Sequence, residues 1–234
     1  MKKLEILLLV LVLLLAFVVR LYKIDRPLAD WHSWRQADTA AVSRNFVKDG
    51  FNLLVPKFDD MSSQANGLDN PQRYRFVEFP VYNLIIALVW KIFGVQVMYA
   101  RLTTVLITLA STTVLYFLVR TYSGRKTAIL SSFFFAIIPY NVFYSSTILP
   151  APFMVFSTLS LYLTFTKWLE NQKIKYFLAS LLFANLAILS WPIALFFMLP
   201  VVYLSFNKFG FSAFKNIKLY LFLMESNKEI PYLK

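Results

Sequence analysis

The sequence predicts an all-α polytopic membrane protein with about six transmembrane helices. Of the 234 residues, 59% are hydrophobic, and the mean hydropathy is +0.60, which is more apolar surface than a soluble domain needs. Long apolar runs alternate with short polar segments, as in membrane spans. The basic residues, which give a net charge of +12, collect in some of these polar segments and are missing from others, a pattern typical of cytoplasmic and outer loops.

Composition also narrows the functional classes. The chain has no cysteine and one histidine, which excludes disulfides, cysteine-based metal or redox sites, and multi-histidine metal sites within it. In a soluble protein, the positive charge would suggest nucleic acid. Here cytoplasmic loops and anionic headgroups explain it better, so we expect membrane lipids and no nucleic acid as partners.

The first span is expected at residues 6–22. Lys2 and Lys3 precede the apolar run and hold the N-terminus inside. A signal peptide is the alternative, but no small-x-small cleavage site follows the run. Arg20, at the end of the span, is expected to snorkel outward.

A large outer loop is expected at residues 23–97, with juxtamembrane amphipathic helices at 39–49 and 80–93. In the first helix, Val42, Phe46 and Val47 share one face, and Gly50 is a suitable C-terminal stop. The apolar part of the second helix, 81–90, is too short to cross a bilayer core of about 30 Å. We therefore expect the second helix to lie along the membrane surface.

Five further spans are expected within residues 98–207, with hinges at 150–152 and 190–192. If 80–93 does not cross, the basic clusters all fall on the side of the N-terminus, and the hinge loops, which lack Lys and Arg, fall outside. This single membrane domain, 1–234, then ends in a cytoplasmic tail or truncated seventh span at 208–234.

Two polar segments of the outer loop, 31–40 and 73–80, contain the candidate functional residues. Taken alone, Asp38 is an N-cap, Glu78 an anion favoured at a helix start, and His32 a hydrogen-bonded loop residue. Arg35 and Arg101 can simply bind headgroups. Together, carboxylates and arginines on one membrane face can supply a general base and hold a phosphate. The pattern therefore indicates group transfer from a lipid phosphate.

These motifs resemble the GT-C glycosyltransferases, in the branch of protein O-mannosyltransferases and the lipid A aminoarabinose transferase (glycosyltransferase families 39 and 83). Residues 32–46, read as His-Ser-Trp-Arg-Gln-Ala-Asp-Thr-Ala-Ala-Val-Ser-Arg-Asn-Phe, look like the bacterial first-loop signature. The run from Glu78 to Tyr82 is similar to the acidic-x-Pro segment that opens the second juxtamembrane helix. Arg101 matches an arginine that begins the next span. The similarity runs from about residue 1 to 206.

The resemblance implies an enzyme that moves a sugar, with inversion, from a polyprenyl-phosphate donor to a lipid, glycan or protein acceptor. It implies a bacterial or archaeal plasma membrane and a site on the outer face. It makes Asp38 the general base and Glu78 the residue that arranges the donor phosphate or a divalent cation. The candidate substrate-binding residues are Arg35, His32, Arg101 and Tyr82.

Two positions depart from the family pattern. Ala151 stands where the family often has an acidic residue, and Trp191 where it often has a lysine. Family members also continue for several more spans, so the chain resembles a truncated member, to which a partner chain could supply the missing spans. The alternative function is a non-catalytic fragment or partner subunit that keeps the scaffold. A transporter is disfavoured, because the later spans carry no charged residue.

Overall fold

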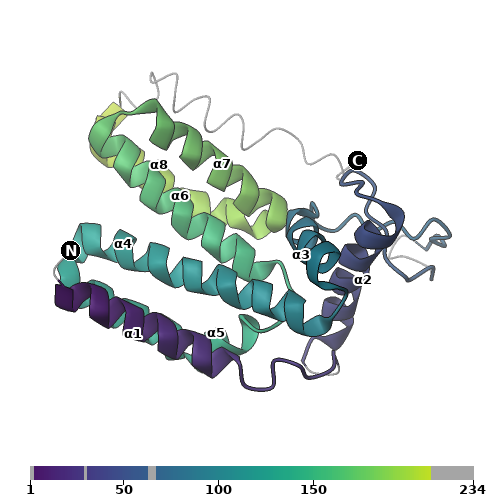
Figure 1. Ribbon diagram of the computed structural model, residues 1–234. Coiled ribbons are helices and arrows are strands. Elements are labelled where there is room, and N and C mark those ends of the chain that lie inside the picture. The colour runs from purple at the N-terminus through teal and green to yellow at the C-terminus, as the bar shows by residue number, and fades with distance from the viewer. Residues whose placement is uncertain (1–2, 29–30, 63–66, 212–234) are drawn as a thin grey trace.

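A computed structural model describes residues 3–28, 31–62 and 67–211 (Figure 1). Within these ranges there is no β-strand, only an isolated antiparallel bridge between Lys57 and Tyr74. The elements in chain order are α1 (Lys3–Arg20), α2 (Ser33–Asp49), α3 (Val81–Phe93), α4 (Val97–Ile137), α5 (Pro139–Tyr144), α6 (Ala151–Asn171), α7 (Ile174–Ser190), the 3-10 helix η1 (Pro192–Met198) and α8 (Leu199–Phe209). The all-helical fold class is confirmed.

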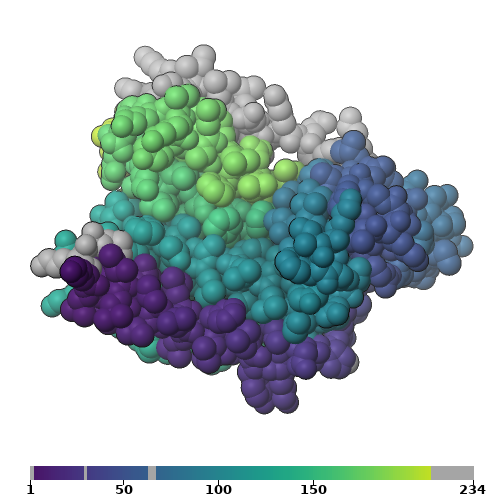
Figure 2. All heavy atoms as spheres, in the orientation of Figure 1, coloured from purple at the N-terminus to yellow at the C-terminus, as the bar shows by residue number. Residues whose placement is uncertain are grey.

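The long helices form a bundle, and α2 and α3 lie across one end of it (Figure 1). In Figure 2, α1 packs along α4, and the α6–α8 group covers the other side of α4. Small side chains allow this close packing: Ala16 of α1 and Ala136 of α4 are both fully buried in one cluster. The platform of α2 and α3 is therefore carried on the end of an apolar bundle.

A glycine reverses the chain within α4. Gly124 has φ 79° and ψ −176°, a conformation that is essentially restricted to glycine. Residues on both sides of the reversal meet α1 in one cluster, where Tyr116 and Ala128 pack against Leu9. The two halves of α4 therefore run side by side in opposite directions.

α6 and α7 form a second antiparallel pair. Gln172, in the left-handed conformation at φ 53°, ends α6, and α7 begins two residues later at Ile174. Trp168 is fully buried between them, with its ring 5.3 Å from those of Phe165 and Phe177. This aromatic cluster fixes the end of the bundle that lies away from α2 and α3.

Among the described residues, two helices are long and apolar enough to cross a membrane, α4 and the continuous η1–α8 segment Pro192–Phe209. Val81–Phe93 and Ile174–Ser190 are shorter apolar helices. Helices do occupy each segment that the sequence predicted as a span. From residue 212 onward, the predicted tail or seventh span lies outside the described residues.

The start of the first juxtamembrane helix was predicted wrongly. α2 begins at Ser33 instead of residue 39, so Asp38 lies inside the helix and is not its N-cap. The N-cap is His32, at φ 59° and ψ 32°, whose carbonyl accepts a 3.0 Å hydrogen bond from the Gln36 amide. Arg, Gln and Ala after Trp34 are good helix formers, which explains the early start. The predicted end is confirmed, because Gly50 is the C-cap at φ 98°.

α2 is also less amphipathic than the sequence indicated. Val42 and Phe46 are buried as expected, but Asn45, a polar residue outside the predicted apolar face, is also only 5% exposed. Its amide donates to the carbonyl of Lys57 at 3.1 Å. The loop after α2 folds back over the helix, and this covering of the polar face could not be seen in the helical pattern.

Arg20 does not snorkel. It is 1% exposed at the end of α1, and its guanidinium donates to the Ser145 hydroxyl at 2.6 Å and to the Ala136 carbonyl at 2.9 Å. These bonds connect the end of α1 to the region of α5. The arginine is therefore an internal tie between helices.

Candidate functional site

The platform is held rigidly by buried amides. The side chain of Asn83 in α3 donates to the Thr39 carbonyl of α2 at 2.7 Å. Gln36, which is fully buried, donates to the Trp31 carbonyl and accepts a 3.2 Å bond from the Ile148 amide. These bonds hold α2 against α3 and against the segment just before α6, so side chains on the first turns of α2 keep a fixed position.

The loop between α2 and α3 brings Arg75 to this platform. Around the Lys57–Tyr74 bridge, the Phe58 amide donates to the Arg73 carbonyl at 2.9 Å and the Arg75 amide to the Pro56 carbonyl at 3.0 Å. The Arg75 guanidinium lies 5.5 Å from the centre of the Phe58 ring, a favourable cation–π distance. Backbone pairing thus places a buried arginine beside α2.

Four charged side chains meet here, and we call Arg35, Asp38, Arg75 and Glu78 the charge cluster. An Arg35 guanidinium nitrogen lies 2.7 Å from a Glu78 carboxylate oxygen, and an Arg75 nitrogen lies 3.7 Å from an Asp38 carboxylate oxygen. The side chains are only 7% to 27% exposed. The two candidate catalytic carboxylates, forty residues apart in sequence, therefore lie on the same side of the protein.

The surroundings shift the acid–base properties of two members. Burial raises the pKa of the Asp38 carboxyl above its ordinary value, an effect that Arg75 and then Arg35 oppose. Asp60 and Asp59, in the loop after α2, add to the upward shift. Burial lowers the pKa of Arg75, and repulsion from Arg35 lowers it further. A carboxyl with a raised pKa is a stronger base when ionised, as a proton acceptor must be.

A cavity of about 500 Å³ opens beside the cluster. Arg35 and His32 contribute its basic groups, from the first turn of α2 and the residue before it. Its aromatic lining comes from distant parts of the chain: Trp34, Tyr140, Tyr144 and Trp191. Such a mixture of aromatic walls and a few polar groups is typical of ligand sites. Asp38 does not line this cavity, and Glu78 reaches it through Arg35.

Two predicted substrate-binding residues lie elsewhere. Arg101 is fully buried at the start of α4, and its guanidinium donates to the carbonyls of Ile24, Arg26 and Pro27. Tyr82 is 1% exposed, and its hydroxyl lies 2.6 Å from that of Thr104. In this structure, Arg101 holds the segment after α1, and Tyr82 joins α3 to α4.

The residues do not form a set that fits the divalent cation suggested at Glu78. Among the residues that the structure describes, no three His, Asp or Glu side chains converge. The Glu78 carboxylate already bonds Arg35. Hard divalent cations need several oxygen ligands, and Glu78 alone does not supply them.

Sequence reasoning did not select Arg75 or the cavity residues Tyr140 and Tyr144. Arg75 was visible only as one of two arginines in the Arg73-Tyr74-Arg75 run, and nothing local indicates which of them turns inward. Tyr140 and Tyr144 lie one helical turn apart on α5, with rings 4.4 Å apart. This spacing was the available signal, but aromatic pairs are common in membrane helices.

A protein-family model described as dolichyl-phosphate-mannose-protein mannosyltransferase matches residues 70–225. The chain belongs to this family. The dolichyl-phosphate-mannose-protein mannosyltransferase family is membrane-embedded and of the GT-C type, and uses a lipid-linked sugar donor. The matched range includes Arg75 and Glu78 and excludes His32, Arg35 and Asp38. A comparison with curated proteins finds no match.

Membership confirms the resemblance seen in the sequence at the level of the family. It identifies a membrane glycosyltransferase of the mannosyltransferase type.

Proposed function

We propose that the protein transfers a sugar from a polyprenyl-phosphate donor to a lipid, glycan or protein acceptor on the outer face of a bacterial or archaeal plasma membrane, with inversion. The observation that carries this proposal is the charge cluster, which combines a carboxylate of raised pKa with an arginine that lines a cavity of about 500 Å³. The first-loop signature favours the bacterial branch of the family.

In the proposed reaction, Asp38 accepts the proton of the acceptor hydroxyl. The acceptor oxygen forms a bond to the anomeric carbon, and the bond from that carbon to the phosphate oxygen breaks on the opposite face. The departing phosphate keeps the electron pair. Arg35 meets its growing negative charge, and Glu78, bonded at 2.7 Å, holds Arg35 in position. The acceptor can reach the Asp38 carboxylate because the Asp38 side chain is 27% exposed.

The membrane arrangement supports an outer site. The proposal places both termini inside, gives the chain about six spans, and puts α2 and α3 on the outer surface. At 13 residues, α3 is about 20 Å long, which is shorter than the bilayer core of about 30 Å. Its position across the end of the bundle suits a helix that lies in the interface (Figure 1).

The test is a transfer assay with polyprenyl-phosphate sugars in reconstituted membranes. Asp38→Asn should lower transfer by at least about 100-fold, because an amide cannot accept the proton. Asp69→Asn, in an exposed part of the same loop, is the matched control and should leave transfer unchanged. Full activity in Asp38→Asn would remove the general base from the proposal.

One observation favours the alternative of a non-catalytic scaffold. Ala151 and Trp191, the two departures from the family pattern, both line the cavity. The wall therefore lacks the acidic and basic side chains that the family often has there. Under this alternative, the wild type transfers no sugar from any polyprenyl-phosphate donor, yet still binds such a donor in the cavity.

A further inference from the structure

A second large hollow lies at the opposite end of the bundle from the charge cluster. A groove of about 650 Å³ runs between α1 and the second half of α4. Its apolar walls are Leu4, Leu8, Leu11 and Leu15 of α1 and Ile129 and Phe133 of α4. The four leucines repeat every three or four residues and so form one face of the helix. They are all at least 38% exposed.

Charged residues surround only one end of the groove. Glu5, Arg125 and Lys126 line it there, and Arg120 lies close by. Glu5 is 5% exposed, accepts a hydrogen bond from the Tyr116 hydroxyl, and lies 3.0 Å from the Arg120 and 3.7 Å from the Arg125 guanidinium. Two of the three cations, Arg120 and Arg125, face this one carboxylate, and Lys126 lines the groove beside them. The end of the groove keeps an excess of positive charge.

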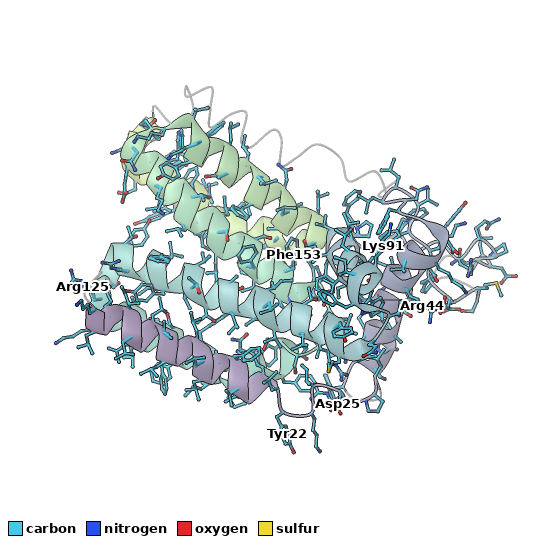
Figure 3. All side chains as sticks on the ribbon, viewed as in Figure 1. Tyr22, Asp25, Arg44, Lys91, Arg125 and Phe153 are labelled. Atoms are coloured by element: carbon cyan, nitrogen blue, oxygen red, sulfur yellow. The ribbon has the colours of Figure 1, made fainter. Side chains whose placement is uncertain are left out.

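This site is separate from the proposed active site. Figure 3 shows Arg125 at one end of the molecule and Arg44 and Lys91, which belong to α2 and α3, at the other. α1 alone, with 18 residues, separates the ends by about 27 Å. A ligand in this groove does not touch the charge cluster.

We propose that the groove binds one anionic phospholipid of the inner leaflet. Arg125 and Lys126 bind its phosphate, and one acyl chain lies along the leucine face of α1. Basic pockets between membrane helices on the cytoplasmic side are suited to anionic headgroups. The side chains from Leu4 to Leu15 span about 16 Å of helix, which matches one leaflet of a hydrocarbon core about 30 Å thick.

Charge decides between this occupant and another helix. A packed apolar helix would fill the groove without using Arg125, whose side chain is 51% exposed, or Lys126. A phospholipid uses both the apolar leucine face, through its acyl chain, and the basic end of the groove, through its phosphate. The assignment to the inner leaflet rests on the orientation given under the proposed function, with the N-terminus inside. It does not depend on sugar transfer, so a failed transfer assay leaves it standing.

Photo-crosslinking tests the site in the unaltered protein. The full chain is reconstituted in vesicles of phosphatidylcholine and phosphatidylglycerol, with a diazirine in the acyl chain of one lipid at a time. Crosslinks from phosphatidylglycerol should concentrate within residues 4–15 and 129–133, and those from phosphatidylcholine should not. Equal crosslinking by both lipids, or none in these segments, would overturn the proposal.

Variants then test the charge. Lys126→Gln leaves the ion pairs of Glu5 in place and should weaken the preference for phosphatidylglycerol about five-fold, the effect of one basic side chain near a headgroup. The matched control is the exposed pair Lys173→Gln/Lys175→Gln, which should keep the full preference. Equal losses in both variants would reduce the effect to general surface charge and refute the site.

Filling the groove gives an independent result. Leu8→Trp should reduce the crosslinks, while Leu178→Trp, at a 55% exposed position of α7, should not. Helix content and elution as a single species confirm that each variant folds. A crosslink between Leu8→Cys positions of two chains, formed without added lipid, would assign the groove to a second copy instead.

Discussion

Asp38 lies in the second turn of α2, which changes what its substitution does to stability. Since it is not a cap, Asp38→Asn removes no capping bond. Burial raises its pKa above the ordinary value of 3.8 even with Arg75 beside it, so the ionised form is less stable in the folded chain than in the unfolded one. We therefore predict that Asp38→Asn unfolds at a higher temperature than the wild type at pH 7.

The pH dependence of this stability difference shows whether the ionised Asp38 carboxylate causes it. Because the folded pKa is raised, the wild type recovers stability as the pH falls through that pKa, and the difference vanishes below 3.8, where both states are protonated. Thermal unfolding in detergent from pH 7 to pH 4 measures it, with Asp69→Asn as the control. A variant that is less stable than the wild type at pH 7 would mean that the contact with Arg75 outweighs burial.

The Arg35–Glu78 pair should be strongly coupled. At 2.7 Å, with side chains 17% and 10% exposed, either single substitution to Gln leaves a poorly solvated charge and should cost about 1–3 kcal/mol of unfolding free energy. The double variant should cost less than the sum of the two. Chemical unfolding of all four proteins in detergent gives the coupling energy.

The Arg44–Asp59 pair is the matched control, because its side chains are 45% and 52% exposed. Exposed pairs are screened by water, so its coupling should be below about 1 kcal/mol. Equal coupling in the two pairs would contradict the view that the charge cluster is shielded from solvent.

Single residues also show where sequence reasoning ends. Asp38, Glu78 and Arg35 were selected from local motifs, and the structure brings them together. Arg101 belongs to the same family pattern, yet it bonds backbone carbonyls away from the cavity. An arginine has the same appearance in sequence whether it faces a ligand or a carbonyl, and only tertiary contacts distinguish the two.

Among the elements, α4 depends most on one residue. Gly124 reverses the chain at φ 79° and ψ −176°, and no atom lies within 4 Å of the position where a Cβ would be added. Gly124→Ala therefore introduces backbone strain without a steric clash, and should cost about 1–3 kcal/mol. Thermal unfolding in detergent measures it.

The neighbouring Ser123→Ala, at an exposed helical position, is the control and should be nearly neutral. If Gly124→Ala were equally neutral, the two halves of α4 would have to be joined by a different local conformation.

The ends of helices could be predicted from sequence where the residue type restricts the backbone conformation. Pro80 and Gly50 mark a helix start and a helix end that the structure confirms. The start of α2 was missed because His32 adopts the left-handed conformation, which no capping pattern announces. The covering of α2 by the loop after it was missed for a similar reason, since it depends on pairing between residues near 57 and 74.

For the whole molecule, composition predicted the all-helical class, but not how the helices share the membrane. Apolar runs mark where helices can lie, and they carry little information about neighbours, because lipid and protein interiors are equally apolar. The cavity shows this limit, since its lining joins α2, α5, α6 and Trp191. The prediction of about six spans rests on segment length and charge, and labelling of introduced cysteines tests it.

The orientation in the membrane is the last prediction. Basic residues near 125, 173 and 208 should be cytoplasmic, and the loop between α2 and α3 should be outside. The chain has no cysteine, so Asp69→Cys and Gln172→Cys each report one site. An impermeant maleimide should label Asp69→Cys in intact cells, and Gln172→Cys only after permeabilisation.

This experiment also decides the position of α3. If α3 crossed the membrane, every later loop would change sides, and Gln172→Cys would react in intact cells together with Asp69→Cys. Tyr140→Cys, on α5 beside the cavity and 71% exposed, provides the third position. It should react from the same side as Asp69→Cys, because under the proposed function the donor enters the cavity from the outer leaflet, on the side where the charge cluster lies.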